Sequence, residues 1–318
     1  MFLVEFYIMI DNKRSKGRYF TKGNPFNLRP FQSWLDKTNL SRKILLEPFA
    51  GANDIIKTLH SMSLCNKFSS YDISPSDKFV KKRNSIKNFP TGYKICITNP
   101  PWLARNSATR RGLPYPTTTY DDLYKHCLSL CLKHCEYVGV LIPASYLQTG
   151  LFRDRLSKYI LLHENLFMDT ENPTCLALFN TKKSKRIDLY YDDDHLGTLS
   201  ELKKALPRVC DDKEVRFNDP KGSLGFISFD NTEKPTIRFC EVDEIKDYQI
   251  KVSSRFITRI SGKFDNVSKM IKKLNNQINS FRNNTQDIFL TPFKGMRKDG
   301  FYRRRMEFSL ARDFINAV

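Results

Sequence analysis

The segment most able to do chemistry is Asn99-Pro100-Pro101-Trp102, which directly follows the apolar run at 95–98. The two prolines fix the backbone and remove two donors, so the Asn99 amide oxygen and the main-chain carbonyls remain as acceptors. Such a loop can hold an amino group, and Trp102 offers a flat face on which a flipped base can stack. An isolated NPPW string can also be an ordinary loop, so its meaning depends on what precedes it.

Two acidic residues end earlier apolar runs. Glu47 opens the sequence EPFAG at 47–51, whose glycine turn lets the backbone approach a ligand closely. Asp72 ends the run at 68–72, where a carboxylate can accept hydrogen bonds from both ribose hydroxyls of an adenosine. Taken alone, such an Asp more often caps a turn or a helix. Only Gly51 is present, which argues against the three-glycine fingerprint of NAD-binding proteins.

Taken in order, these segments resemble the S-adenosylmethionine-dependent amino-group DNA methyltransferases of the N6-adenine type found in restriction-modification systems. EPFAG resembles the cofactor loop of that family, Asp72 its ribose-binding acid, and NPPW its catalytic motif. The resemblance implies S-adenosyl-L-methionine as the cofactor and Asn99, Pro100, Pro101 and Trp102 as catalytic residues. The cofactor contacts that it implies in these segments are Glu47, Pro48, Phe49, Ala50, Gly51, Asp72, Ile73 and Asn99.

Other segments are similar to the same family. The stretch KGRYFT at 16–21 resembles the segment that contacts the methionine end of the cofactor, which implies contacts from Tyr19, Phe20 and Thr21. Asn88-Phe89 stands where an Asp-Phe pair commonly holds the cofactor adenine. GVLIPASYL at 139–147 is similar to a strand and loop of the family.

The implied reaction is methyl transfer to the N6 amino group of a flipped adenine in double-stranded DNA. An RNA or a protein-glutamine N-methyltransferase is an alternative, because the loop suits planar amide and amino groups in general. A catalytically silent nucleic-acid-binding module is a third hypothesis. A cytosine-C5 enzyme is excluded, because no Pro-Cys dipeptide is present.

Alternation of short apolar runs with amphipathic stretches predicts the elements that must position these residues. The expected fold is α/β, a Rossmann-like methyltransferase with a mostly parallel seven-stranded sheet, plus a smaller basic C-terminal α+β region. The expected domains are a catalytic domain at 1–185 and a DNA target recognition region at 186–318. The pattern predicts strands at 43–47, 68–72, 93–98, 137–142, 161–168, 174–180, 225–229 and 236–240, and helices at 53–64, 120–135 and 266–281.

The charge of the chain predicts a polyanionic partner. Its 318 residues carry a formal charge of +19, and residues 251–318 hold 15 basic against five acidic side chains. Phosphate backbones favour such patches through counterion release, although a solvated basic surface is the simpler alternative. The segment at 105–119 has three cations and no acid, which suits either a loop that closes over DNA or a plain solvent loop. The predicted nucleic-acid contacts are Arg105, Arg110, Arg111, Arg297, Lys298, Arg303, Arg304 and Arg305.

The remaining composition concerns compartment and partners. Eight cysteines without repeated CxxC spacing are typical of reduced core thiols, and Cys127, Cys131 and Cys135 are expected to pack in the core rather than to bind a metal. We recognise no signal peptide and no run long enough to span a bilayer. We therefore expect a cytoplasmic protein that acts on double-stranded DNA without a membrane or a metal. A cognate restriction endonuclease acting separately is the further partner that the resemblance implies.

Overall fold

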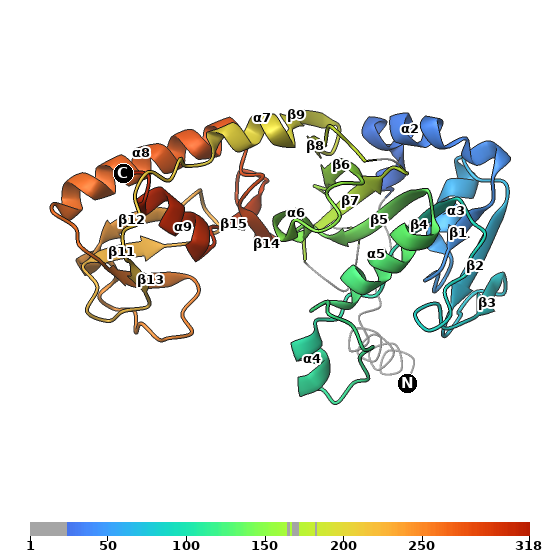
Figure 1. Ribbon diagram of the computed structural model, residues 1–318, viewed down its shortest axis with the longest axis horizontal. Coiled ribbons are helices and arrows are strands. Elements are labelled where there is room, and N and C mark those ends of the chain that lie inside the picture. Colours follow the sequence, from blue (N-terminus) through green and yellow to red (C-terminus); the bar gives the residue numbers. More distant parts are fainter. Residues whose placement is uncertain (1–23, 164–165, 167–171, 182) are drawn as a thin grey trace. The chain divides into compact units, whose positions relative to one another are not determined.

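The computed structural model describes residues 24–163, 166, 172–181 and 183–318. The chain divides into two compact units, one ending at His195 and the other beginning at Leu196 (Figure 1). Tyr19, Phe20 and Thr21 lie outside the described residues. In the described part, no helix is long and apolar enough to cross a membrane.

Nine strands form one sheet in the order β3-β2-β1-β4-β5-β7-β6-β8-β9, and all of them except β9, which continues past His195, lie within the first unit. Neighbouring strands from β3 to β5 are parallel, whereas β7 runs antiparallel to both β5 and β6. The strands are β1 (Leu45–Glu47), β2 (Phe68–Asp72), β3 (Val80–Lys82), β4 (Ile95–Thr98), β5 (Tyr137–Pro143), β6 (Leu156–Leu161), β7 (Thr174–Phe179), β8 (Asp188–Tyr191) and β9 (Asp194–Thr198).

The predicted mixed α/β fold with a mostly parallel sheet is confirmed, but the number of seven strands is wrong. Three strands were missed: the short edge strand β3, and β8 and β9. β8 and β9 lie in a stretch whose run of acids looked like a break from regular structure. Asp192 adopts a φ of 48° between them, a left-handed conformation that Asp tolerates in a turn. β8 then continues the sheet by pairing in parallel with β6.

The strand expected at 161–168 is also placed wrongly, since β6 occupies Leu156–Leu161. Lys158 interrupts its apolar pattern, yet this residue is buried and its ammonium donates to the carbonyl of Pro30 at 3.0 Å. A lysine with such a partner can sit inside a strand, and sequence periodicity cannot show that partner.

Helices pack beside the sheet, as α5 does against β5 (Figure 1). Cys127 and Cys131 on α5 and Cys135 at its C-cap are buried, as expected of core thiols. The helices of this unit are α2 (Arg29–Leu35), α3 (Asp54–Ser61), α4 (Arg105–Arg110), α5 (Leu123–His134) and α6 (Tyr146–Thr149), with short 3-10 turns at Pro25–Asn27, Asp36–Thr38 and Leu40–Arg42.

The second unit is α+β. Its antiparallel sheet has the order β10-β13-β11-β12, and a separate hairpin joins β14 and β15. Strands and helices share one apolar core that includes Phe226, Phe239, Leu274 and Phe314. The elements are α7 (Leu199–Leu202), β10 (Arg216–Phe217), β11 (Leu224–Ile227), β12 (Arg238–Glu241), β13 (Ile257–Ser261), α8 (Val267–Thr285), β14 (Thr291–Met296), β15 (Tyr302–Arg305) and α9 (Phe308–Ile315), with 3-10 turns at Lys203–Ala205 and Val242–Ile245.

Candidate functional site

The strand order reverses between β1 and β4, because the chain first adds β2 and β3 on one side of β1 and then adds β4 and β5 on the other. Open α/β sheets bind ligands at such a switch point, beyond the carboxyl ends of the strands. The register places Glu47 opposite Ser70, two residues before Asp72. Since Leu46 pairs with Cys96, Asn99 also follows at this edge. The three segments that sequence analysis singled out therefore end on the same edge of the sheet.

Glu47 is a buried acid at the centre of this edge. Its carboxylate is 1% exposed, and its Oε1 accepts bonds from the Thr98 hydroxyl and from the amide of Phe49. Oε2 has no hydrogen-bond partner among the residues that the structure describes. Burial raises the pKa of Glu47 to about 8 despite the Thr98 hydrogen bond, and the negative charge of Asp72 adds to this rise. The side chain thus joins the ends of β1 and β4 and keeps one oxygen for a donor.

Asp72 is held by the glycine turn. The amide of Gly51 donates to its Oδ2 at 3.1 Å and the amide of Ser74 to its Oδ1 at 2.7 Å. A carboxylate has about four lone-pair positions, so each oxygen can accept a further bond. Gly51 has a φ of +52°, and a Cβ built there would meet no atom within 4 Å, so the space above the turn is open.

Asn53 completes the turn in a conformation usually left to glycine. Its φ is 65°, and its buried side chain accepts a 2.7 Å hydrogen bond from the Ser70 hydroxyl on β2. Asn enters the left-handed region more readily than most residues. The sequence EPFAGAN therefore forms a tight turn before α3 without a second glycine.

Asn88 and Phe89 lie on the chain between β3 and β4. Arg83 ties this segment to the site, because its amide bonds to the carbonyl of Asp72 and its guanidinium bonds to the side-chain oxygen of Asn88. The Phe89 ring is buried and stacks on His134 with centroids 5.2 Å apart. One face of this ring is therefore already covered. The exposed side chain of Ile73 lies next to Asp72.

The loop from Asn99 to Trp102 is followed by Leu103, whose backbone is hydrogen-bonded to the start of α5. The Leu103 amide donates to Asp122 Oδ1 at 3.2 Å, and the Leu123 amide donates to the Leu103 carbonyl at 3.0 Å. Burial raises the pKa of Asp122 to about 6, against the effect of its backbone donors. Trp102 is only 7% exposed, so its indole is not an open platform in this arrangement. Phe49 packs on the cluster around Leu103, which links the glycine turn to this loop.

The basic segment at 105–119 begins with the six-residue helix α4. The guanidinium of Arg105 donates to the carbonyls of Thr118 and Tyr120 and lies 5.4 Å from the Tyr115 ring centroid. Arg105 thus joins the start of this segment to its end, while Arg110 and Arg111 are exposed.

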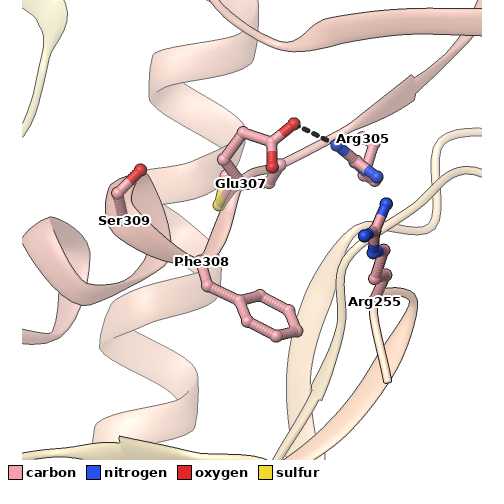
Figure 2. Close-up of a pocket in the computed structure, with 6 residues that line it drawn as sticks. Arg255, Arg305, Glu307, Phe308 and Ser309 are labelled. Carbon is pink, nitrogen blue, oxygen red and sulfur yellow. Dashed lines mark hydrogen bonds and ion pairs between the residues drawn. The ribbon is translucent and has the colours of Figure 1, made fainter. Parts of the chain in front are cut away.

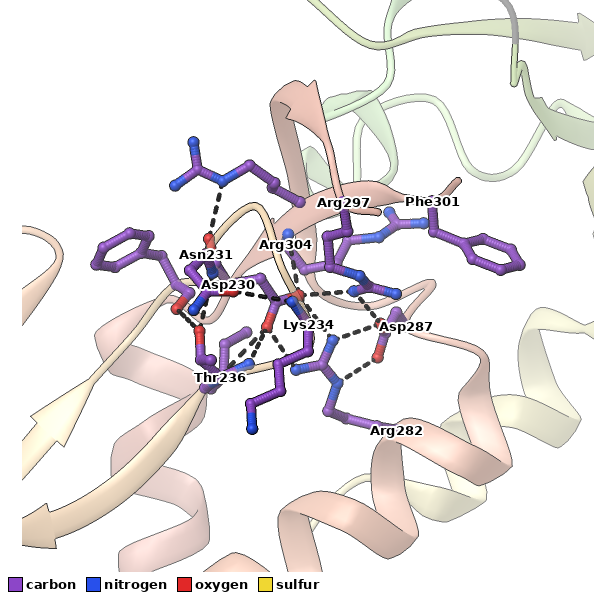
Figure 3. A network of polar contacts seen from close by, with 12 residues as sticks. Asp230, Asn231, Lys234, Thr236, Arg282, Asp287, Arg297, Phe301 and Arg304 are labelled. Carbon is purple, nitrogen blue, oxygen red and sulfur yellow. Dashed lines mark hydrogen bonds and ion pairs between the residues drawn. The ribbon is translucent and has the colours of Figure 1, made fainter. Parts of the chain in front are cut away.

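The predicted cations of the second unit are largely engaged inside that unit. Arg305 pairs with Glu307 (Figure 2), Lys298 with Glu233, and Arg303 lies 4.7 Å from the ring centroid of Phe293. Arg297 and Arg304 are only 7% and 3% exposed. Figure 3 shows both beside Asp230, which accepts from the Arg297 guanidinium and the Arg304 amide. In this arrangement Arg297 and Arg304 offer almost no surface to a phosphate.

Sequence reasoning missed three residues that shape the site: Thr98, Arg83 and Asp122. Thr98 had a visible signal, because it is the polar last residue of an apolar strand and directly precedes Asn99. Arg83 and Asp122 act through pairings with Asn88 and Leu103 that no local pattern encodes. In the described part of the chain, no group of three or more His, Cys, Asp or Glu could hold a metal ion.

A scan against protein-family models matches none of them, and no curated protein matches the chain. Solved structures described as methyltransferases are among those that are similar. One is assigned to the class I S-adenosylmethionine-dependent methyltransferases, from Listeria monocytogenes, with 12% identity, a TM-score of 0.38, and cover of 51% of this chain and 63% of that one. Another is the methyltransferase subunit of a type I restriction-modification system from Streptococcus thermophilus, with 14% identity, a TM-score of 0.38, and cover of 55% and 47%.

A third is the M protein of the type I restriction enzyme EcoKI, with 12% identity, a TM-score of 0.35, and cover of 78% of this chain and 68% of that one. The chain spans less than two thirds of the length of the Listeria and Streptococcus proteins.

Proposed function

We propose that this chain is a DNA methyltransferase that transfers a methyl group from S-adenosyl-L-methionine to the N6 amino group of adenine. One observation carries the proposal: Glu47, Asp72 and Asn99 end three neighbouring parallel strands at the point where the strand order reverses. In this proposal, Asp72 binds a ribose, the buried Glu47 binds a cationic group, and the Asn99 loop supplies hydrogen-bond acceptors, all at one edge of the sheet.

The residues present fit the proposed cofactor. Asp72 keeps acceptor capacity for two ribose hydroxyls, and Gly51 leaves open space above the turn. Glu47 Oε2 has no partner among the described residues, which suits a donor such as the ammonium of the methionine end. When bound, the cofactor supplies a methyl group on a sulfonium, an electrophile that needs no covalent enzyme intermediate.

Asn99 and Pro100 would hold and activate the target. The N6 amino group of adenine is a poor nucleophile, because its lone pair is delocalised into the ring. Hydrogen bonds from this group to the Asn99 side-chain oxygen and the Pro100 carbonyl favour a pyramidal nitrogen aimed at the methyl group. Pro101 fixes the loop that presents these acceptors.

The proposed partner is double-stranded DNA. A target adenine must leave the duplex, at a cost of a few kcal/mol, before the Asn99 loop can reach it. Stacking on Trp102 would first require the indole to be uncovered, since it is 7% exposed. The exposed Arg110 and Arg111 are the candidates near this loop for phosphate contacts, whereas Arg105 is engaged within its own segment. A cognate restriction endonuclease acting separately remains part of this proposal.

The test is to incubate the full chain with S-adenosyl-L-methionine and unmethylated genomic DNA, with total RNA in parallel, and to quantify methylated nucleosides by mass spectrometry. The proposal predicts N6-methyladenine in DNA only. Methylation of RNA alone would favour the RNA enzyme. Cofactor binding by calorimetry without any turnover would favour the silent binding module.

A further inference from the structure

The second unit contains a pocket of about 370 Å³ where the hairpin strand β15 leads into α9. It is lined by Arg255, Arg305, Met306, Glu307, Phe308 and Ser309. Arg255 comes from the segment before β13, so two distant parts of the unit bring their guanidinium groups to one place (Figure 2). Arg255 was not among the cations that the sequence suggested.

The pocket has an excess of positive charge. Glu307 is its one carboxylate, and this group already binds the Arg305 guanidinium and the Thr291 hydroxyl. Arg255 is exposed, and its guanidinium makes no ion pair or hydrogen bond with any residue in the described part of the chain. Two guanidinium groups facing a single carboxylate leave a net charge of about +1, which an anion of one charge would balance.

The start of α9 adds to this preference. Its N-cap residue, Glu307, makes no side-chain capping bond, and Phe308 and Ser309 of its first turn line the pocket. First-turn amides and the helix dipole favour a negative group at this end of a helix. This feature supports the choice of an anion, but the paired guanidinium groups carry the argument.

The residues around the pocket indicate which class of ligand carries the anionic group. Next to Arg255, Phe256 is 47% exposed and lies 5.2 Å from the Phe229 ring and 6.2 Å from the Phe293 ring, centroid to centroid. The guanidinium of Arg303 lies over both Phe229 and Phe293. The pocket therefore borders a surface of cations and aromatic rings, which is typical of nucleic-acid interfaces.

We propose that this pocket binds a backbone phosphate of duplex DNA, with Arg255 as the principal free donor and Arg305 as the second. The proposal rests on the proposed function for its choice of DNA. A phosphodiester carries one negative charge, which matches the excess charge of the pocket. Guanidinium groups bind phosphate with two parallel hydrogen bonds, so Arg255 would fix the position of the duplex without reading its sequence.

The test compares the full chain with Arg255→Gln in binding to a fluorescent duplex at several salt concentrations, without cofactor. The matched control is Arg208→Gln, because Arg208 is also exposed in this unit and precedes Cys210, whose amide bonds to Asn316 at the far end of α9. Loss of one charged contact should weaken binding roughly tenfold and lower the slope of log Kd against log salt by about 0.9. Arg208→Gln should show the same slope of log Kd against log salt as the unaltered chain. All three proteins should have the same melting temperature.

The outcomes separate this proposal from the proposed function. An unchanged salt slope in Arg255→Gln overturns the pocket assignment, whatever the chain methylates. Absence of duplex binding by the unaltered chain overturns it as well, and binding of structured RNA instead would reassign the pocket to RNA. A lowered slope in a chain that forms no N6-methyladenine would support the phosphate pocket and contradict the methyltransferase.

Discussion

At the scale of single residues, the candidate site contains two polar groups with different chemistry, Glu47 and Asn99, which are connected through Thr98. Glu47 is sealed in the sheet edge and has a strongly raised pKa, whereas Asn99 is a neutral acceptor at all pH values. Thr98 lies between them, since its hydroxyl bonds to Glu47 and its carbonyl leads directly to Asn99. The two residues can therefore be tested by different measurements.

Asn99→Ala should lose methyl transfer while it keeps cofactor binding. The substitution removes an acceptor that the reacting amino group uses mainly in the transition state, which typically costs about 100- to 1,000-fold in rate. Single-turnover kinetics and calorimetry with the cofactor measure the two effects separately. Asn99→Asp keeps an acceptor oxygen and should retain part of the activity. Equal rates for Asn99→Ala and the unaltered chain would contradict the catalytic role.

Glu47→Gln should change how stability depends on pH. The folded pKa of about 8 lies above the ordinary 4.5, so the folded state binds this proton more tightly than the unfolded chain does. Its contribution is complete below pH 4.5 and is lost as the pH rises through about 8, by at most roughly 1.4 kcal/mol per pH unit in that window. Gln cannot ionise, so the variant should gain stability relative to the unaltered chain between about pH 5 and pH 8.

Urea unfolding at the two ends of that window measures the difference. Glu136→Gln is the matched control, because the Glu136 side chain belongs to the same unit and is 41% exposed, with its carboxylate paired to Lys94. A gap between Glu47→Gln and the unaltered chain that stays constant with pH would show that Glu47 is already ionised in the folded state.

At the scale of elements, the second unit depends on one buried acid. Asp230, which follows β11, accepts from the guanidinium groups of Arg282 on α8 and Arg297 after β14, and its main chain pairs with Arg304 on β15 (Figure 3). Burial alone would raise the pKa of Asp230, but the hydrogen bonds and charge of Arg282 lower it below its ordinary value. The same pairing raises the pKa of Arg282 against the effect of burial.

Asp230→Asn should destabilise the second unit by about 3–5 kcal/mol, because it leaves two buried guanidinium groups short of a counter-charge. Hydrogen exchange should show the loss in residues 196–318, while protection of the first unit stays unchanged. Asp247→Asn, an exposed acid of the same unit, is the control. Since the pKa of Asp230 is lowered, its stabilising effect is present above pH 3.8 and disappears as the pH falls through the folded pKa. A loss below 1 kcal/mol in Asp230→Asn would contradict this account.

The elements also show why prediction from sequence succeeded in part. The run at 95–98 is largely apolar, 68–72 carries the aromatic residues Phe68 and Tyr71, and turn residues follow both, so local pattern was sufficient for β2 and β4. The prediction misplaced β6 because it could not foresee that the Lys158 ammonium is buried with the Pro30 carbonyl and the Ser33 hydroxyl as acceptors, 128 and 125 residues away in sequence. β8 and β9 were missed because their turn is made of acids.

At the scale of the whole molecule, the same distinction applies to the candidate site. Glu47, Asp72 and Asn99 could be predicted to lie at one edge of the sheet, because the carboxyl ends of neighbouring parallel strands share an edge. Which arginines are buried could not be predicted from the sequence. Arg297 and Arg304 are buried and Arg255 is exposed because of neighbours that lie far away in the sequence. A net charge of +19 indicates a polyanionic partner, but the fold decides which cations remain on the surface.

The buried network around Asp230 has a consequence for engineering. Its members hold the β14–β15 hairpin to the rest of the second unit, while Arg255 and Phe256 lie exposed on a neighbouring segment. A library that varies the exposed residues and keeps Asp230, Arg282 and Arg297 fixed should therefore yield mostly folded proteins. A library that mutates those three independently should not, because each single change removes one of the few counter-charges of a buried ion.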